Sequence, residues 1–323
     1  LRDSIPENVV LAYYWHIPWP PPSVLTVLPE SDRLLAALLS YDVIGFQTTT
    51  YRDHFFEAVR RELPASLTDE DTGTIQYDGS ETQVFVHPVG IDVRRIRSHI
   101  RDRFDTGREA GVRSRYDVDA ETIVLSVERI DYTKGIVDRL HAFEYLLEHE
   151  PDLRGEVVHV MISSPTRERI PAYQRYGRRV REAITRINDR FGGETWRPIR
   201  HLVSGIPRRE LLDLYRVADV CLVSSRIDGL NLVAMEYLAV NREDDGRLLL
   251  SQFAGASEYL DEAVLVNPYD IESVAEQLGN AIRDRQSGAE SISRSSDSSG
   301  FDYGISNWLG EVNEQISRIR NSK

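Results

Sequence analysis

Short apolar runs alternate with longer amphipathic stretches along most of this chain. From residue 116 onward the runs have the length of strands, and the stretches between them carry apolar residues at helical spacing. Strands are expected at 122–128, 156–163, 199–204, 218–225 and 247–252, and helices at 135–149, 167–190, 208–217 and 231–240. Continuously apolar strands joined by helices are typical of a parallel sheet covered on both faces. The pattern therefore predicts an α/β, doubly wound fold.

The first hundred residues show a weaker form of the same pattern. Strands are expected at 8–16, 42–47 and 82–91, and helices at 31–40 and 50–62. No Gly-rich turn precedes Ile17, although a doubly wound domain normally opens with a strand, such a turn and a helix. We therefore expect residues 1–115 to form the later part of a first domain and 116–300 to form a complete second one. The Ser- and Gly-rich segment 283–304 predicts a linker, and 301–323 a helix that packs back toward the first domain.

The charge of the chain argues against several classes of partner. The formal net charge is −13 over 323 residues, so nucleic acids and anionic membranes would be repelled over most of the surface. No apolar run reaches the roughly 18 residues that span a bilayer, and the start lacks the layout of a signal peptide. We therefore expect a cytoplasmic protein. Its acidic, lysine-poor composition resembles that of halophile proteins, and its lone Cys221 is expected to be a small buried hydrophobe.

Two cations follow the expected strand 122–128. Lys134 is one of only two lysines among the 39 lysines and arginines of the chain. Arg129 and Lys134 lie in the turn between that strand and a helix, and ligands of open α/β sheets bind at this end of the strands. A guanidinium fork and a compact ammonium together suit a diphosphate. The alternative is a pair of solvated surface cations, which the scarcity of lysine disfavours.

A second group of polar residues lies in SRIDGLNLVAMEYLA, residues 225–239. Asp228 and Gly229 predict a turn, and a helix begins near Asn231 whose first N–H groups would favour a phosphate. A carboxylate does not bind phosphate, but Asp228 could accept hydrogen bonds from a hexose and Glu236 from ribose hydroxyls. From these residues alone, a simple turn and a solvated helix residue remain the alternative.

His16 and Arg167 are further candidates. His16 ends an expected strand and precedes prolines at 18, 20, 21 and 22. These prolines predict a rigid, extended loop that would place the histidine, or a surface loop with an incidental one. Arg167 follows the expected strand 156–163, at the same edge of the sheet as Arg129. It could bind a second phosphate or cap an arginine-rich helix.

Together these segments resemble the trehalose-6-phosphate synthase family of retaining glycosyltransferases, glycosyltransferase family 20. Family-like motifs occur in family order from about residue 9 to 312. The motifs are HIPWP, YDVIGFQT, HPVGID, VERIDYTKG, DGLNLVAMEY, LLLSQFAGAS and LVNPYD. A single one would be weak support, but seven in order are highly specific.

The resemblance implies a GT-B architecture, in which two Rossmann-like, doubly wound domains face each other across a cleft. It implies a glucosyltransferase that moves glucose from UDP-glucose, or a similar nucleotide-glucose, to glucose 6-phosphate and gives trehalose 6-phosphate. No cofactor, metal, nucleic acid or membrane is implied as a partner. The resemblance leaves room for a homo-oligomer and for a trehalose-6-phosphate phosphatase acting downstream.

Motif position assigns the individual roles. The residues placed on the nucleotide side of the donor are Arg129, Lys134, Asn231, Leu232, Val233 and Glu236. Among them Glu236 would hold the ribose. Asp228 would bind the transferred glucose, His16 would contact its far side, and Arg167 would hold the phosphate of the acceptor. The catalytic set would be Arg129, Lys134, Asp228 and His16. No protein nucleophile and no general base are implied, because the leaving phosphate itself takes the proton of the attacking hydroxyl.

The chain also departs from the family pattern. The family begins with roughly 130 further residues, which carry the Gly-rich turn of the first domain, and this chain begins with Leu1. We therefore expect a fragment with an incomplete first domain. Trp19 replaces the usual Phe, and Met235 replaces a Lys of many members. Two alternatives stay open: a glucosylglycerol-phosphate synthase, and a non-catalytic nucleotide-sugar-binding or regulatory protein.

Overall fold

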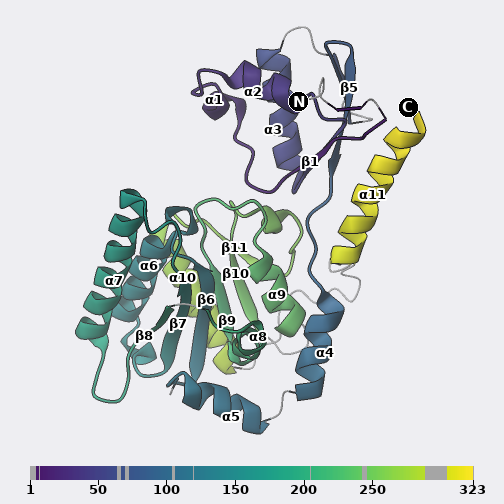
Figure 1. The fold of residues 1–323 in the computed structure, drawn as a ribbon. Coiled ribbons are helices and arrows are strands. Elements are labelled where there is room, and N and C mark those ends of the chain that lie inside the picture. The colour runs from purple at the N-terminus through teal and green to yellow at the C-terminus, as the bar shows by residue number, and fades with distance from the viewer. Residues whose placement is uncertain are drawn as a thin grey trace. The chain divides into compact units, whose positions relative to one another are not determined.

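The chain divides into two compact units, each built on its own β-sheet. The computed structural model describes residues 5–6, 8–63, 67–69, 73–103, 106–118, 120–203, 205–241, 246–287 and 304–322. The first unit comprises Leu1–Ile91 and Asp302–Lys323, and the second comprises Asp92–Phe301 (Figure 1). The predicted α/β fold with parallel sheets is confirmed.

The sheet of the first unit is mixed. Its strands run in the order β1-β2-β5-β4-β3. They are β1 (Ala12–Trp15), β2 (Val43–Phe46), β3 (Leu67–Asp69), β4 (Thr74–Tyr77) and β5 (Ser80–Val86). Strands β1, β2 and β5 pair in parallel. Strand β4 pairs antiparallel with both β5 and β3, and the sequence pattern did not predict these antiparallel pairs. The helices of this unit are α1 (Pro22–Leu25), α2 (Ser31–Leu38), α3 (Thr49–Glu62) and α11 (Ile305–Ser322).

A buried tryptophan anchors the proline-rich loop in the core of the first unit. Trp19 is only 1% exposed, and its ring packs edge-on against Phe46 and Phe55 at centroid distances of 5.9 and 5.0 Å. Pro22 then opens α1, where proline is well tolerated because the first helical N–H needs no partner. The loop after His16 is therefore fixed by burial as well as by its prolines.

The sheet of the second unit is entirely parallel. Its strands run in the order β11-β10-β9-β6-β7-β8. They are β6 (Thr122–Arg129), β7 (Val157–Ser164), β8 (Ile199–Val203), β9 (Val220–Val223), β10 (Arg247–Ser251) and β11 (Val264–Val266). Five of them coincide with the predicted apolar runs to within a few residues. β6 and β9 are neighbours, so the chain order reverses between them.

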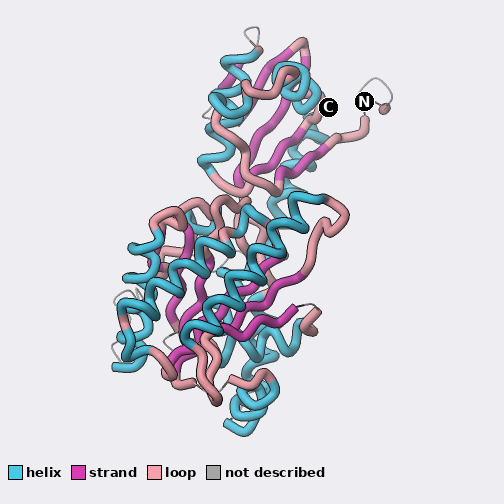
Figure 2. Tube along the Cα trace, turned by 90° about the vertical axis from the view of Figure 1, so that its left-hand side faces the viewer, coloured by secondary structure: helices cyan, strands magenta, loops and turns pink. Residues whose placement is uncertain are grey.

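Helices cover both faces of this sheet (Figure 2). On one face α6 (Ile136–His149) packs against α7 (Pro171–Phe191) and α10 (Ile271–Ser287). On the other, α8 (Arg208–Val217) and α9 (Leu232–Asn241) pack against each other and against α4 (Val93–Arg103), while α5 (Thr106–Arg115) contacts α8. Short 3₁₀ turns complete the unit: η2 (Tyr132–Lys134), η3 (Pro151–Leu153) and η4 (Gly255–Glu258).

Some predicted boundaries differ from the structure. The units separate between Ile91 and Asp92 rather than after residue 115, because α4 and α5 pack on helices of the second unit. Helix α7 begins at Pro171, four residues later than predicted, because Arg167 has a φ of 49° that no right-handed helix accommodates. α10 extends to Ser287, so the first residues of the predicted linker 283–304 are helical, and most of the rest lies outside the described residues.

Replacing Trp19 tests how far the first unit depends on this anchor. Trp19→Ala should lower the free energy of unfolding of the first unit by about 3–5 kcal/mol, because it leaves a large cavity. Trp19→Phe should cost less than about 1.5 kcal/mol, because the buried indole N–H has no hydrogen-bond partner among the described residues. Urea unfolding followed by tryptophan fluorescence measures both variants. Equal losses in the two would show that the indole N–H, rather than ring volume, matters.

Candidate active site

The loops after β6, β7 and β9 lie at one edge of the second unit's sheet. β6 pairs in parallel with both neighbours, so the carboxyl ends of the three strands meet there. Arg129 ends β6 and is in register with Ser164, which ends β7. Lys134, Arg167 and Asp228 follow these three strands and are therefore carried by neighbouring loops.

The loop after β6 is a tight turn that presents Lys134. The carboxylate of Asp131 accepts hydrogen bonds from the N–H of Thr133 at 3.0 Å and from its hydroxyl at 2.9 Å, which caps η2. Gly135 follows with a φ of 62°, and a Cβ at this position would lie 2.3 Å from the carbonyl oxygen of Ser224. Glycine is therefore required for the β6 loop to approach the end of β9 this closely.

Backbone hydrogen bonds join the loops after β6, β9 and β10. The N–H of Arg226 donates to the carbonyl of Thr133 at 2.8 Å. The N–H of Asp228 donates to Phe253 at 3.1 Å, and that of Gly255 returns to Asp228 at 3.1 Å. Satisfied backbone groups of this kind fix a loop in place. Asp228 thus stands on a framework built by three strands.

The carboxylate of Asp228 is the centre of a polar cluster. Its Oδ2 accepts hydrogen bonds from Lys134 Nζ at 2.7 Å, from Asn231 Nδ2 at 2.9 Å and from Ser225 Oγ at 3.4 Å. The side chains of Lys134 and Asp228 are 14% and 16% exposed. This ion pair is partly shielded from water, so its attraction exceeds that of a surface pair. The structure thus brings three sequence-predicted residues into direct contact.

Asn231 also starts helix α9. Its φ is 89°, in the left-handed half of backbone space that Asn tolerates better than most residues. Its Oδ1 accepts the N–H of Ala234 at 3.0 Å as a helix cap. Leu232 and Val233 form the first turn of α9, where N–H groups have no intrahelical acceptor. The start of α9 therefore offers backbone donors and a partial positive charge beside Asp228.

Arg129 adds an exposed cation at this edge. Its guanidinium makes no hydrogen bond or ion pair with any residue that the structure describes. Other arginines of the second unit do pair with carboxylates, for example Arg139, Arg208 and Arg226. Over the described part of the chain, Lys134 has one carboxylate partner and Arg129 has none. The edge therefore retains unneutralised positive charge, as a site for an anion requires.

Arg167 is joined to the β6 loop through a tyrosine. Its Nη1 donates to the hydroxyl of Tyr173 at 2.5 Å, and this hydroxyl donates to Asp131 Oδ2 at 3.4 Å. The bond to the Tyr173 hydroxyl raises the pKa of Arg167, so the guanidinium stays charged. Tyr173 is buried at the start of α7. Sequence reasoning did not find it, because a buried tyrosine on a helix resembles an ordinary core residue.

Glu236 is buried, not solvated. It lies in the second turn of α9 and is 7% exposed. Arg208 Nη1 donates to Oε1 at 2.7 Å, and the hydroxyl of Tyr215 donates to Oε2 at 3.3 Å. Burial and the neighbouring carboxylate raise the pKa of Tyr215 well above its usual value, so this hydroxyl remains a donor. Arg208, which follows β8, was not predicted as a site residue. Its position after a strand was the only signal in the sequence that could have indicated such a role.

His16 belongs to the first unit. It follows β1, its ring lies 4.8 Å from that of Tyr14, and its Nδ1 lies 3.5 Å from Gln47 Nε2. Gln47 Oε1 in turn accepts the N–H of Val89 at 2.9 Å. These contacts link the ends of β1, β2 and β5, the three parallel strands of that unit. The carboxyl edge of the first sheet therefore holds His16, as the carboxyl edge of the second holds the other candidates.

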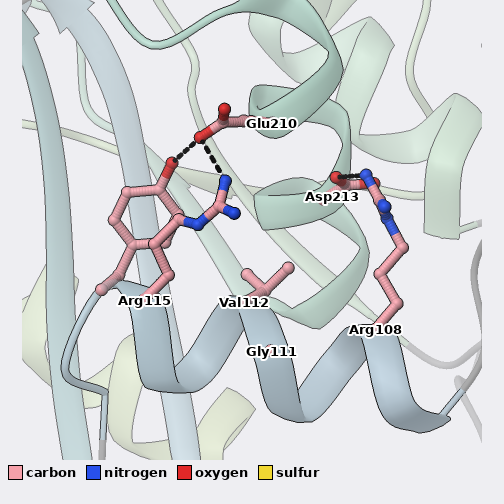
Figure 3. Close-up of a pocket in the computed structure, with 7 residues that line it drawn as sticks. Arg108, Gly111, Val112, Arg115, Glu210 and Asp213 are labelled. Atoms are coloured by element: carbon pink, nitrogen blue, oxygen red, sulfur yellow. Dashed lines mark hydrogen bonds and ion pairs between the residues drawn. The ribbon is translucent and has the colours of Figure 1, made fainter.

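A separate pocket of about 220 Å³ lies between α5 and α8 (Figure 3). Arg115 pairs with Glu210 at 3.1 Å, and Arg108 pairs with Asp213 at 2.5 Å. The hydroxyl of Tyr116 donates to Glu210 at 2.7 Å, and burial with this carboxylate raises the pKa of Tyr116 to about 12. None of the sequence-predicted site residues lines this pocket.

Over the described ranges no group of three or more His, Cys, Asp or Glu side chains is arranged to hold a metal ion. Within the same ranges no helix is both long and apolar enough to cross a bilayer. Cys221 is buried in β9 and unpaired, and burial raises the pKa of its thiol, which fits a small core residue.

Known proteins resemble the chain over nearly its whole length. The profile of glycosyltransferase family 20 matches residues 1–318. The 56 kDa subunit of the UDP-forming alpha,alpha-trehalose-phosphate synthase of Saccharomyces cerevisiae is 36% identical over 282 residues, covering 85% of this chain and 55% of the yeast protein. The chain thus spans little more than half the length of this relative.

Solved structures share the fold. A trehalose-6-phosphate structure from E. coli bound with UDP-2-fluoro glucose matches with a TM-score of 0.87 and 32% identity, over 96% of this chain and 68% of that one. An alpha,alpha-trehalose-phosphate synthase (UDP-forming) from Burkholderia xenovorans in complex with glucose-6-phosphate matches with a TM-score of 0.86 and 32% identity, over 95% and 68%. The motifs, the parallel sheets and these likenesses agree: the chain belongs to glycosyltransferase family 20.

Proposed function

We propose that this chain is part of a retaining glucosyltransferase that transfers glucose from UDP-glucose to glucose 6-phosphate and forms trehalose 6-phosphate. The observation that carries the proposal is the cluster of Lys134, Asp228 and Asn231 at the carboxyl edge of the second sheet. The relatives that the chain resembles are named UDP-forming trehalose-phosphate synthases, and one was solved with glucose-6-phosphate.

The donor diphosphate would bind between Arg129, Lys134 and the start of α9. The guanidinium of Arg129 is exposed and unpaired among the described residues, so it can bind phosphate oxygens without losing another partner. The first N–H groups of α9, at Leu232 and Val233, supply neutral donors. Together they would stabilise the negative charge that develops as the diphosphate departs.

Asp228 and Glu236 would recognise the glucose and the ribose of the donor. A carboxylate accepts hydrogen bonds from several donors, and glucose hydroxyls could exchange with donors such as Asn231 and Ser225 that contact Asp228 Oδ2 in the structure. Glu236 is held by Arg208 and Tyr215, which fixes the direction in which it can accept ribose hydroxyls. Fixed acceptors orient the donor without a cost in side-chain entropy at binding.

In the proposed reaction the acceptor hydroxyl attacks on the face from which the diphosphate leaves. The new glycosidic bond forms as the bond from the anomeric carbon to phosphate breaks, and the phosphate oxygen takes the proton of the hydroxyl. No metal and no protein nucleophile take part in this scheme. The chain's residues bind and orient the two substrates and stabilise the leaving charge. Arg167 would hold the acceptor phosphate, and His16 would contact the transferred glucose.

The proposal is tested with the natural protein that carries this sequence. It is incubated with UDP-glucose and glucose 6-phosphate, and the products are identified by NMR and mass spectrometry. Formation of UDP and trehalose 6-phosphate is the expected result. Transfer to glycerol 3-phosphate instead would show that the acceptor is glycerol 3-phosphate and not glucose 6-phosphate. UDP binding without transfer to either would favour a binding protein. The homo-oligomer and the downstream phosphatase stay predictions that size-exclusion and pull-down experiments can address.

Lys134→Ala should lower the transfer rate by about 10²–10³-fold, because it removes a charge that stabilises the leaving diphosphate. It should also weaken UDP binding in calorimetry. Lys134→Arg is the matched control: it keeps the charge but changes its reach, so it should lose less than the alanine variant. Unchanged turnover of Lys134→Ala at saturating donor would contradict the assignment.

Asp228→Asn should separate UDP binding from transfer. Lys134 then loses its one carboxylate partner among the described residues, so the free ammonium should bind UDP about threefold to tenfold more tightly, as expected for about 1 kcal/mol of lost competition. The transfer rate should fall at least tenfold because the glucose loses an orienting carboxylate. Calorimetry with UDP and initial rates measure the two effects. Weaker UDP binding would show that Asp228 supports Lys134 instead of competing for it.

Arg167→Ala should raise the apparent KM for glucose 6-phosphate by about 10–100-fold, since a charge-assisted hydrogen bond is worth roughly 1.5–3 kcal/mol. The KM for UDP-glucose should change far less. Arg169→Ala is the control, because Arg169 is exposed on the same loop and makes no hydrogen bond or ion pair with any residue that the structure describes. A defect confined to the donor would show that Arg167 serves the other substrate.

A further inference from the structure

A buried ion pair lies directly behind the proposed diphosphate site. Glu128, the penultimate residue of β6, pairs with Arg139 on α6. The side chain of Arg139 is 1% exposed and that of Glu128 is 9% exposed. Arg139 also reaches the end of β9, where its Nη1 lies 3.3 Å from Ser224 Oγ and 3.5 Å from the carbonyl of Leu222. One guanidinium therefore links the ends of the two strands whose loops carry Lys134 and Asp228.

Stability alone gives this pair little reason to exist. Removing two charges from water is costly, and apolar residues of similar volume often replace a buried pair without loss of stability. α6 also contributes Leu140, Phe143 and Leu147 to an apolar core. A charged pair in such a core calls for a role that an apolar pair could not fill.

The charges around Glu128 suggest that role. Burial raises the pKa of Glu128, while the charge of Arg139 and, more weakly, that of Lys134 lower it, so Lys134 is close enough to act on this carboxylate. On β7, burial and Arg139 hold the pKa of His159 well below its usual value, so this imidazole is neutral. On β9, burial keeps the thiol of Cys221 protonated. Among the described residues, Arg139 and Lys134 are therefore the cations whose charges act on Glu128.

We propose that Arg139 is a positioning residue that holds the carboxylate of Glu128 and so leaves Lys134 free for Asp228 and the donor diphosphate. This role rests on the proposed function. Without Arg139, an ionised Glu128 would have Lys134 as its remaining cationic neighbour and would draw the ammonium inward. The phosphate side of the site would then lose much of its positive charge. Glu128 and Arg139 touch no substrate in this scheme; they act through Lys134.

The proposal is tested with three variants in the natural protein: Arg139→Met, Glu128→Gln, and the two combined. Arg139→Met should weaken UDP binding and lower the transfer rate at least tenfold at pH 8. In the combined variant, UDP binding and the transfer rate should both recover to within about threefold of the parent, because Glu128 no longer competes for Lys134. Glu128→Gln alone should stay within the same range, because Lys134 remains free. Circular dichroism checks that each variant is folded.

The pH profile separates this role from a packing defect. In Arg139→Met the pKa of Glu128 should rise, because the main cation that lowers it is gone. Glu128 is then neutral at low pH and leaves Lys134 free, and it ionises as the pH rises. UDP binding by this variant should therefore weaken with increasing pH, relative to the parent, and the combined variant should lack this dependence.

Each outcome decides the question. A combined variant as impaired as Arg139→Met, with no pH dependence in either, would show that Arg139 acts only as a packing or strand-linking residue and would overturn the proposal. If Arg139→Met does not fold, impaired UDP binding by the combined variant would overturn it equally. UDP binding by calorimetry does not require turnover, so a parent that binds UDP but transfers no glucose would refute the proposed reaction and leave the Arg139 test intact.

Discussion

The parallel pairing of β6 with both β7 and β9 is the constraint on which the candidate site depends. Because the chain order reverses beside β6, the loops that leave β6 and β9 emerge side by side at one edge of the sheet. The bond from Arg226 to Thr133 and the close approach of Gly135 to Ser224 hold these loops together. The contact between Lys134 and Asp228, which are far apart in sequence, follows from this pairing.

The charge distribution at this edge differs from that of the whole chain. With a net charge of −13, the surface as a whole would repel anionic substrates. The edge instead holds Lys134, the start of α9 and Arg129, which is unpaired among the described residues, while the buried carboxylate of Glu128 is matched by Arg139. Low solvent exposure strengthens the Lys134–Asp228 and Glu128–Arg139 pairs. An anion could therefore bind to this acidic protein, because positive charge is concentrated at this edge and the carboxylate of Glu128 behind it is paired with Arg139.

The sequence predicted much of this arrangement and missed specific parts of it. Strands β6 to β10 were predictable because continuous apolar runs such as TIVLSVE have few alternatives, and the positions of Lys134 and Asp228 at strand ends followed from them. Periodicity does not encode contacts between side chains of different elements, such as Arg167 with Tyr173, Glu236 with Arg208, and Glu128 with Arg139. Residues 92–115 were assigned to the wrong unit because the sequence pattern does not say which sheet the helices α4 and α5 cover.

The identity of residue 134 can now be explained physically. The hydrogen bonds described for Asp228 from Lys134, Asn231 and Ser225 all end on Oδ2. A guanidinium tends to bind both oxygens of a carboxylate as a fork, and it would place a planar group where the side chain of Lys134 is only 14% exposed. An ammonium makes a single compact contact and keeps further donors for a second anion. A lysine can therefore bridge a carboxylate and a phosphate in this confined space, which explains why a chain that otherwise uses arginine retains a lysine here.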